Sequence, residues 1–199
     1  MSLDDNSFSI FLDTIKKFVD NKLIPREEEV AETNSIPEDI VEEMKNIGLF
    51  GISIPTEYGG SNLSMEQEVK LTFELGRASP AFRSMAGTNI GIGSQTIVMS
   101  GTDEQKQKYL PKFSTGEIIG SFALTEPDSG SDAMSITTSA KKVGNEYLIN
   151  GTKRYITNAP IAGVFSVMAR TNEEKSLSLI HISEPTRRTP ISYAVFCLK

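Results

Sequence analysis

The sequence of 199 residues contains a single cysteine and a single histidine. One cysteine excludes an internal disulfide framework and any cysteine-rich zinc site. Both residues lie in the C-terminal stretch HISEPTRRTPISYAVFCLK, as His181 and Cys197. A cysteine–histidine pair can act as a nucleophilic dyad, but no supporting motif surrounds this one. We therefore expect no metal site and no catalytic dyad here.

The sequence also lacks long apolar runs and an excess of positive charge. No apolar stretch approaches the roughly 20 residues that a membrane-spanning helix needs. The formal net charge of −6 argues against nucleic acid as the main partner, because no basic stripe is available to neutralise phosphates. The acidic N-terminus, MSLDDNSF, has no signal-peptide pattern. These absences predict a soluble, cytoplasmic protein.

Helical patterns fill the first part of the chain. Apolar residues recur at helical spacing from residue 8 to residue 19, and Pro25 ends that pattern. Capping-box spacings predict the starts of three further helices, at Ser35/Glu38, Ser64/Gln67 and Thr102/Gln105, the last of which halts at Pro111.

The segment FRSMAGTNIGIGSQTIVMSG predicts a buried helix. Its glycines do not fit a dinucleotide-binding loop, because Thr96 stands at the last glycine position and no strand precedes them. Gly87 and Gly91 are better explained as sites where a neighbouring helix approaches closely. The cluster KQKYLPK, which begins at Lys106, is interpreted as a solvated helix end rather than an anion site.

The periodicity changes near Gly116. β-Branched and aromatic residues predict strands over residues 118–126, 135–142, 146–150, 153–158 and 164–171. Gly144-Asn145 and Asn150-Gly151 suit two-residue hairpin turns. The sequence therefore predicts an α+β fold, with an N-terminal all-helical domain (1–116) followed by a truncated antiparallel β domain (117–176).

One turn stands out as a candidate binding element. In FALTEPDSGSD, residues 122–132, a strand runs into a turn rich in Asp, Ser and Gly. Backbone N–H groups and hydroxyls exposed together in such a turn can hold an anion or a heteroaromatic edge. An ordinary strand-terminal turn would have the same composition. What favours a site is a second segment, NGTKRYITNA, at a spacing that one small sheet would bring close.

Four collinear motifs resemble the acyl-CoA dehydrogenase family. They are GLFGISIPTEYGG, GTDEQKQKYLPKFSTGEIIGSF, FALTEPDSGSD and YLINGTKRYITN. The resemblance extends from about Phe8 to Arg170 and implies the family's fold, an FAD cofactor and an acyl-CoA substrate. It also implies removal of an α-proton by a glutamate base while the β-hydrogen passes as hydride to flavin N5.

The resemblance assigns the cofactor-binding residues to two segments. The first runs along the flavin, with Thr125 at the ring edge and Ser131 touching both cofactor and substrate. The second covers the other side of the flavin and places the Thr157 hydroxyl near N5. Tyr155 stands where tryptophan is frequent in the family, and Asp128 and Ser129 replace a commoner small pair. The implied cofactor-binding residues are Phe122, Ala123, Leu124, Thr125, Gly130, Ser131, Tyr155, Ile156 and Thr157.

The resemblance also implies parts that this sequence does not show. In the family the catalytic glutamate lies in a C-terminal helical bundle, so we expect no catalytic base in this fragment and no activity from it alone. Family membership further implies electron-transfer flavoprotein as electron acceptor, a homotetramer at full length, and a role in fatty acid or amino acid catabolism. A flavin oxidase or monooxygenase on the same scaffold and a non-catalytic helical interaction module are the alternatives.

The C-terminal segment does not match the family pattern. LSLIHISEPTR resembles the in-frame translation of a sequencing adapter, and ISYAVFCLK resembles that of the primer which follows it. We therefore expect residues 177–199 to be a non-native tail. His181 and Cys197 would then not belong to the native protein.

Overall fold

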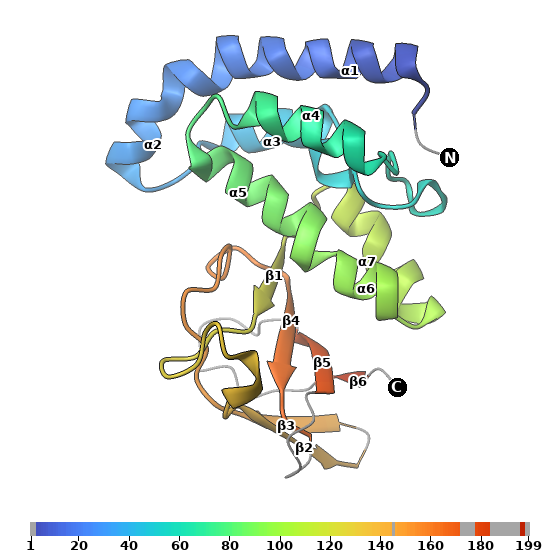
Figure 1. Ribbon diagram of the computed structural model, residues 1–199, viewed down its shortest axis with the longest axis vertical. Helices are drawn as coiled ribbons and strands as arrows, with labels where there is room; N and C mark the ends of the chain where they lie inside the picture. Colours follow the sequence, from blue (N-terminus) through green and yellow to red (C-terminus); the bar gives the residue numbers. More distant parts are fainter. Residues whose placement is uncertain (1–2, 145, 172–177, 184–195, 198–199) are drawn as a thin grey trace.

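The computed structural model describes residues 3–144, 146–171, 178–183 and 196–197. Figure 1 shows an N-terminal helical region, with α1 across its outer side, and a smaller β region beneath it. The predicted α+β class is confirmed. The non-native tail predicted for residues 177–199 lies largely outside the described residues, apart from the backbone of two short strands. The dyad alternative depends on side chains that also lie outside them.

Seven α-helices are described in the helical region, linked by short π and 3₁₀ turns. Their bounds are α1 Asp5–Phe18, α2 Glu27–Thr33, α3 Glu38–Asn46, α4 Met65–Leu75, α5 Pro80–Thr88, α6 Gln95–Ser100 and α7 Asp103–Ser114. No helix among the described residues is long and apolar enough to cross a membrane.

Helix capping follows the sequence signals at two of the three predicted positions. Ser64 and Thr102 form complete capping boxes at the starts of α4 and α7. The box predicted at Ser35 is wrong, because α3 begins after Pro37 without a side-chain cap. The predicted stop at Pro111 is also wrong. α7 continues to Ser114. The proline removes one backbone donor, but the side chains of Leu110 and Phe113 in this last turn are fully buried and hold it against the core.

The helix predicted over residues 82–101 is broken in the middle. α5 passes into a π turn, Asn89–Gly93, in which Gly91 has non-helical dihedral angles, and α6 follows. The close-packing role predicted for Gly87 and Gly91 is wrong. A Cβ atom at Gly91 would meet nothing within 4 Å, whereas one at Gly93 would lie 2.8 Å from the Thr88 carbonyl oxygen. The close approach is between Gly93 and Gly120 at the start of β1.

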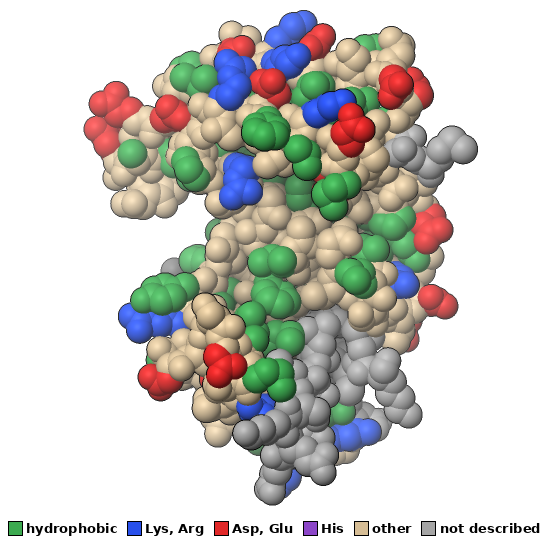
Figure 2. Space-filling view, viewed as in Figure 1, with side chains coloured by type: hydrophobic (Ala, Val, Ile, Leu, Met, Phe, Trp, Pro, Cys, Tyr) green, Lys and Arg blue, Asp and Glu red, His purple; other side chains and the backbone are tan. Residues whose placement is uncertain are grey.

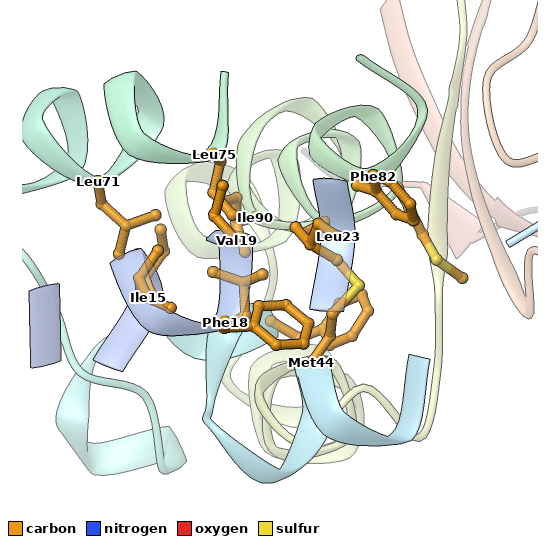
Figure 3. Packing of buried hydrophobic residues seen from close by; sticks show 14 of the residues in the cluster. Ile15, Phe18, Val19, Leu23, Met44, Leu71, Leu75, Phe82 and Ile90 are labelled. Atoms are coloured by element: carbon orange, nitrogen blue, oxygen red, sulfur yellow. The ribbon is translucent and has the colours of Figure 1, made fainter. Parts of the chain in front are cut away.

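The main hydrophobic core lies between α1, α3, α4 and α5. Figure 3 shows Ile15 of α1 and Val19 just after it on the side of Leu71 and Leu75, and Phe18 near Met44. Burial of such side chains is the dominant stabilising contribution to a fold of this kind. The helical region therefore has a core largely of its own, to which Ile119, just before β1, also contributes.

Two small sheets form the β region. The first has strand order β1-β4-β5-β6, and the second is a hairpin of β2 and β3. Their bounds are β1 Gly120–Ala123, β2 Ser139–Val143, β3 Glu146–Asn150, β4 Val164–Ala169, β5 Ser178–Ser183 and β6 Phe196–Cys197. The β2–β3 hairpin is antiparallel as predicted, and β4 pairs antiparallel with β5. β1 pairs with β4 in parallel, so the sheet is not a simple meander.

The strand predicted over residues 153–158 does not form. Tyr155 and Asn158 have left-handed backbone conformations, with φ of 59° and 65°, which interrupt the extended conformation that a strand requires. Gly151, at the start of this segment, has to be a glycine because a Cβ atom at this position would lie 2.3 Å from the Thr138 hydroxyl oxygen. The segment that the family resemblance places over the flavin is therefore a loop with two left-handed residues, not a strand.

Asn89 joins the helical region to the β region. Its side chain is fully buried, donates to the Phe113 carbonyl (3.3 Å) and accepts from the backbone N–H of Gly120 (2.7 Å). A second contact links Thr96 on α6 to Ser166 on β4, hydroxyl to hydroxyl at 2.7 Å. The start of β1 is thus fixed by the π turn that breaks the helix before it.

Candidate functional site

The two segments that the sequence singles out lie side by side. The backbone N–H of Arg154 donates to the Thr125 carbonyl at 2.9 Å. The Ser121 hydroxyl donates to the Thr157 carbonyl. The two segments are therefore joined at the backbone carbonyls of Thr125 and Thr157, the two threonines predicted to contact the flavin.

A buried ion pair between Glu126 and Lys153 lies beneath these segments. The side chains are 3% and 12% exposed, and Lys153 Nζ lies 2.9 Å from Glu126 Oε1. The other Glu126 contacts come from the Thr137 N–H (2.6 Å), the Thr137 hydroxyl (2.7 Å) and the Thr138 N–H (2.9 Å). Lys153 also donates to the Leu124 carbonyl at 2.8 Å. Both charges are therefore well supplied with hydrogen bonds, as buried charges require.

Glu126 is held ionised by these partners. Burial alone would raise the pKa of its carboxyl, but the hydrogen bonds from Thr138, Thr137 and Lys153 outweigh burial and hold the pKa well below its usual range. Burial lowers the pKa of the Lys153 ammonium, and the Glu126 carboxylate opposes that shift. Neither residue was predicted as a site residue from the sequence, although both lie inside the quoted motifs. A charged residue at the end of an apolar strand was the signal available.

The turn after Glu126 is organised by its own polar contacts. The Glu126 N–H donates to the Ser129 carbonyl (2.8 Å), and the Ser129 hydroxyl donates to the Asp132 carbonyl (2.6 Å). Asp132 in turn caps the short 3₁₀ helix Ala133–Ser135. Ser129 is buried, whereas Asp128, Gly130 and Ser131 are exposed. The turn therefore has a fixed inner side and an open outer side.

The predicted cofactor-binding residues fall into three groups. Ala123 is buried in a small cluster with Ala162, Phe165 and Val167. Phe122, Leu124, Thr125 and Ile156 are half-buried. Gly130, Ser131, Tyr155 and Thr157 are exposed.

Three hydroxyls in these segments are available to a ligand. Within the described part of the chain, no hydrogen bond is formed by the hydroxyls of Thr125, Ser131 or Thr157. By contrast, the neighbouring hydroxyls of Ser121, Ser129 and Thr137 all have protein partners. A flat heteroaromatic ring with polar edges needs several such donors. The residues present thus fit a flavin.

Tyr155 presents an exposed aromatic ring in the same loop as Thr157. Its side chain is 78% exposed, and the Arg154 guanidinium lies 4.6 Å from the ring centroid, within the range of a cation–π contact. The left-handed conformation of Tyr155 is uncommon for a bulky residue and marks a position worth functional attention. An exposed tyrosine held in this way is suited to cover a planar ligand.

A groove opens beside Thr157. Figure 2 shows the molecule hollowed between the helical region and the β region, on the side of α2. The groove has a volume of about 1070 Å³ and is lined by α2, α3, the start of α5 and residues 157–161.

Among the described residues, no group of three histidine, cysteine, aspartate or glutamate side chains could hold a metal ion.

Comparison with known proteins agrees with this geometry. Residues 7–117 match the acyl-CoA dehydrogenase N-terminal domain, and residues 121–191 match the acyl-CoA dehydrogenase middle domain. The chain is 38% identical over 161 residues to mitochondrial isovaleryl-CoA dehydrogenase of Pongo abelii, covering 80% of this chain and 38% of that protein. The middle-domain match extends into the predicted non-native tail.

Solved structures show the same likeness. A glutaryl-CoA dehydrogenase in complex with glutaryl-CoA superimposes with a TM-score of 0.84 at 32% identity, covering 93% of this chain and 48% of that chain. An acyl-CoA dehydrogenase from Bacillus anthracis complexed with FAD gives 0.82 at 32% identity, covering 100% of this chain and 37% of that one. The chain thus spans less than half the length of these proteins. It belongs to the acyl-CoA dehydrogenase family.

Proposed function

We propose that the full-length protein is an FAD-dependent acyl-CoA dehydrogenase that introduces an α,β double bond into an acyl-CoA thioester. The observation that carries this proposal is the meeting of the two family segments, with the hydroxyls of Thr125, Ser131 and Thr157 forming no hydrogen bond to any residue that the structure describes. When bound, FAD supplies the acceptor, at its N5 atom, for the hydride that leaves the β-carbon of the thioester.

The residues of this chain act on that chemistry through position and hydrogen bonding. Thr157 is proposed to donate its hydroxyl where negative charge develops, which favours the transition state over the ground state. Thr125 binds the ring edge, and Ser131 contacts both cofactor and thioester. Tyr155 covers one face of the ring and excludes water from it.

The proposal extends to partners that this chain alone does not contain. The α-proton is removed by a glutamate expected in the C-terminal part of the full-length protein, so the present chain is proposed to be inactive alone. The electron acceptor is proposed to be electron-transfer flavoprotein, and the full-length protein is proposed to be a homo-oligomer.

Flavin spectroscopy of the full-length protein tests the proposal. The purified protein should show bound-flavin absorbance, and a reactive acyl-CoA should bleach it under anaerobic conditions, whereas free CoA should not. Faster reoxidation by electron-transfer flavoprotein than by oxygen identifies a dehydrogenase, and the reverse identifies an oxidase. A protein that binds no flavin would overturn the proposal.

A further inference from the structure

The Glu126–Lys153 pair is connected to every segment of the candidate site. Lys153 Nζ donates to the two residues that flank Thr125 in the sequence, at the Leu124 carbonyl (2.8 Å) and the Glu126 carboxylate (2.9 Å). Along the chain, Lys153 is followed by Arg154, whose N–H binds the Thr125 carbonyl, and then by Tyr155. One buried side chain thus sets the position of Thr125 relative to the 155–157 loop.

Glu126 extends the connection in the other direction. Its two carboxylate oxygens accept hydrogen bonds from the backbone N–H groups of Thr137 (2.6 Å) and Thr138 (2.9 Å), which lie just before β2. The turn from Pro127 to Ile136 is therefore closed at its base by this carboxylate. Because that turn carries Ser131, the same residue sets where the Ser131 hydroxyl lies.

We propose that Lys153 and Glu126 are positioning residues that pre-set the two flavin-contacting segments before any ligand binds. This inference rests on the proposed function. Their side chains are only 3% and 12% exposed and their polar atoms bind protein groups, so the proposal gives neither of them a contact with the cofactor. A pre-set site binds more tightly because less conformational freedom is lost on binding. The pair should therefore affect FAD affinity without touching FAD.

Charge balance alone is a competing explanation, and a double variant separates the two. Lys153→Met leaves a buried carboxylate unpaired, so it should destabilise the fold as well as the site. Lys153→Met combined with Glu126→Gln removes both charges and should recover most of the fold stability. If the bridge from Lys153 to Leu124 and Glu126 positions the segments, the double variant should still have a loosened site.

Two measurements report on the order of the site without relying on enzyme activity. In this chain without added ligand, amide hydrogen exchange at Thr137, Thr138 and Arg154 should be at least about tenfold faster in the double variant. In the full-length protein, titration of FAD into apoprotein should show affinity reduced about tenfold or more, with an unchanged far-UV spectrum. Lys112→Met, which breaks the exposed ion pair with Glu117, is the matched control and should change neither quantity.

The outcomes are distinguishable. Unchanged exchange rates and unchanged FAD affinity in the double variant would overturn the positioning role while leaving the proposed function intact. A wild-type full-length protein with no affinity for FAD would instead reject the proposed function. Loss of affinity with wild-type exchange rates would also overturn the inference, because the segments would then be positioned without the pair.

Discussion

The helical and β regions of this molecule are stabilised in different ways. The helical region buries a large continuous cluster of apolar side chains, which includes Phe18, Leu23, Phe50 and Phe82. The clusters of the β region are small and rich in alanine, such as Ala140 with Ala169. Apolar burial therefore specifies the helical region, whereas polar contacts specify the shape of the β region.

Arg170 illustrates the polar contribution. Its guanidinium donates to the carbonyls of Ile136 (2.6 Å) and Met134, and its backbone joins β4 to residues 138 and 140. Together with Glu126 and Lys153, it holds loops that have little apolar surface to bury. Such a region gains less from burial and leaves more side chains, such as Tyr155, available to a ligand.

The largest effect on stability is expected in the helical core. Phe82 on α5 is fully buried, and Phe82→Ala should lower the free energy of unfolding by about 3–5 kcal/mol because it removes apolar contacts and leaves a cavity. Phe73 on α4 is 75% exposed, so Phe73→Ala should change the free energy of unfolding by no more than about 0.5 kcal/mol. Urea unfolding followed by circular dichroism measures both. Equal effects would show that the assigned core is wrong.

The joint between the regions should be nearly as sensitive. Asn89→Ala removes the partners of two buried backbone groups, at Phe113 and Gly120. Each unsatisfied group costs about 1–3 kcal/mol, so a total loss of about 2–6 kcal/mol is expected. Thr96→Val removes the hydroxyl contact with Ser166 and should cost about 1 kcal/mol. If Asn89→Ala were the milder change in the same unfolding experiment, the regions would not be joined at Asn89.

Acid should weaken the β region through Glu126. Because its pKa in the folded protein lies below its usual value, its stabilisation is present above the unfolded pKa of about 4.3. That stabilisation is lost as the pH falls from there toward the folded pKa. Glu126→Gln should therefore lower stability at neutral pH and flatten the loss below about pH 5. Unfolding midpoints measured from pH 7 downward check this, and parallel pH profiles would contradict it.

The smallest effect is expected from removing the tail. If residues 177–199 are not native, their deletion should leave the helix content and the unfolding midpoint of the helical region unchanged or improved. Circular dichroism and thermal unfolding of the two chains provide the comparison. Loss of folding on deletion would show that the tail packs natively. The nucleotide sequence beyond codon 176 gives an independent check.

The sequence predicted the helical region better than the β region for a physical reason. Helical periodicity and caps at Ser64 and Thr102 are local signals, and they specified α1, α4 and the start of α7 correctly. The 155–157 loop depends on left-handed residues and on the distant contact of Lys153 with Glu126, which local patterns do not encode. The motifs located the candidate site, but its buried ion pair required the structure.

The most direct test of the flavin site is the rate of flavin reduction in Thr157 variants of the full-length protein, measured by stopped-flow bleaching with a reactive acyl-CoA. Removing one preorganised donor typically costs about 2.7–4 kcal/mol when full charge develops. Because N5 develops less charge, Thr157→Ala and Thr157→Val should be about tenfold to hundredfold slower, with FAD still bound, while Thr157→Ser keeps most of the rate. Reduction of Thr157→Val as fast as wild type would contradict the assignment of this loop to the flavin.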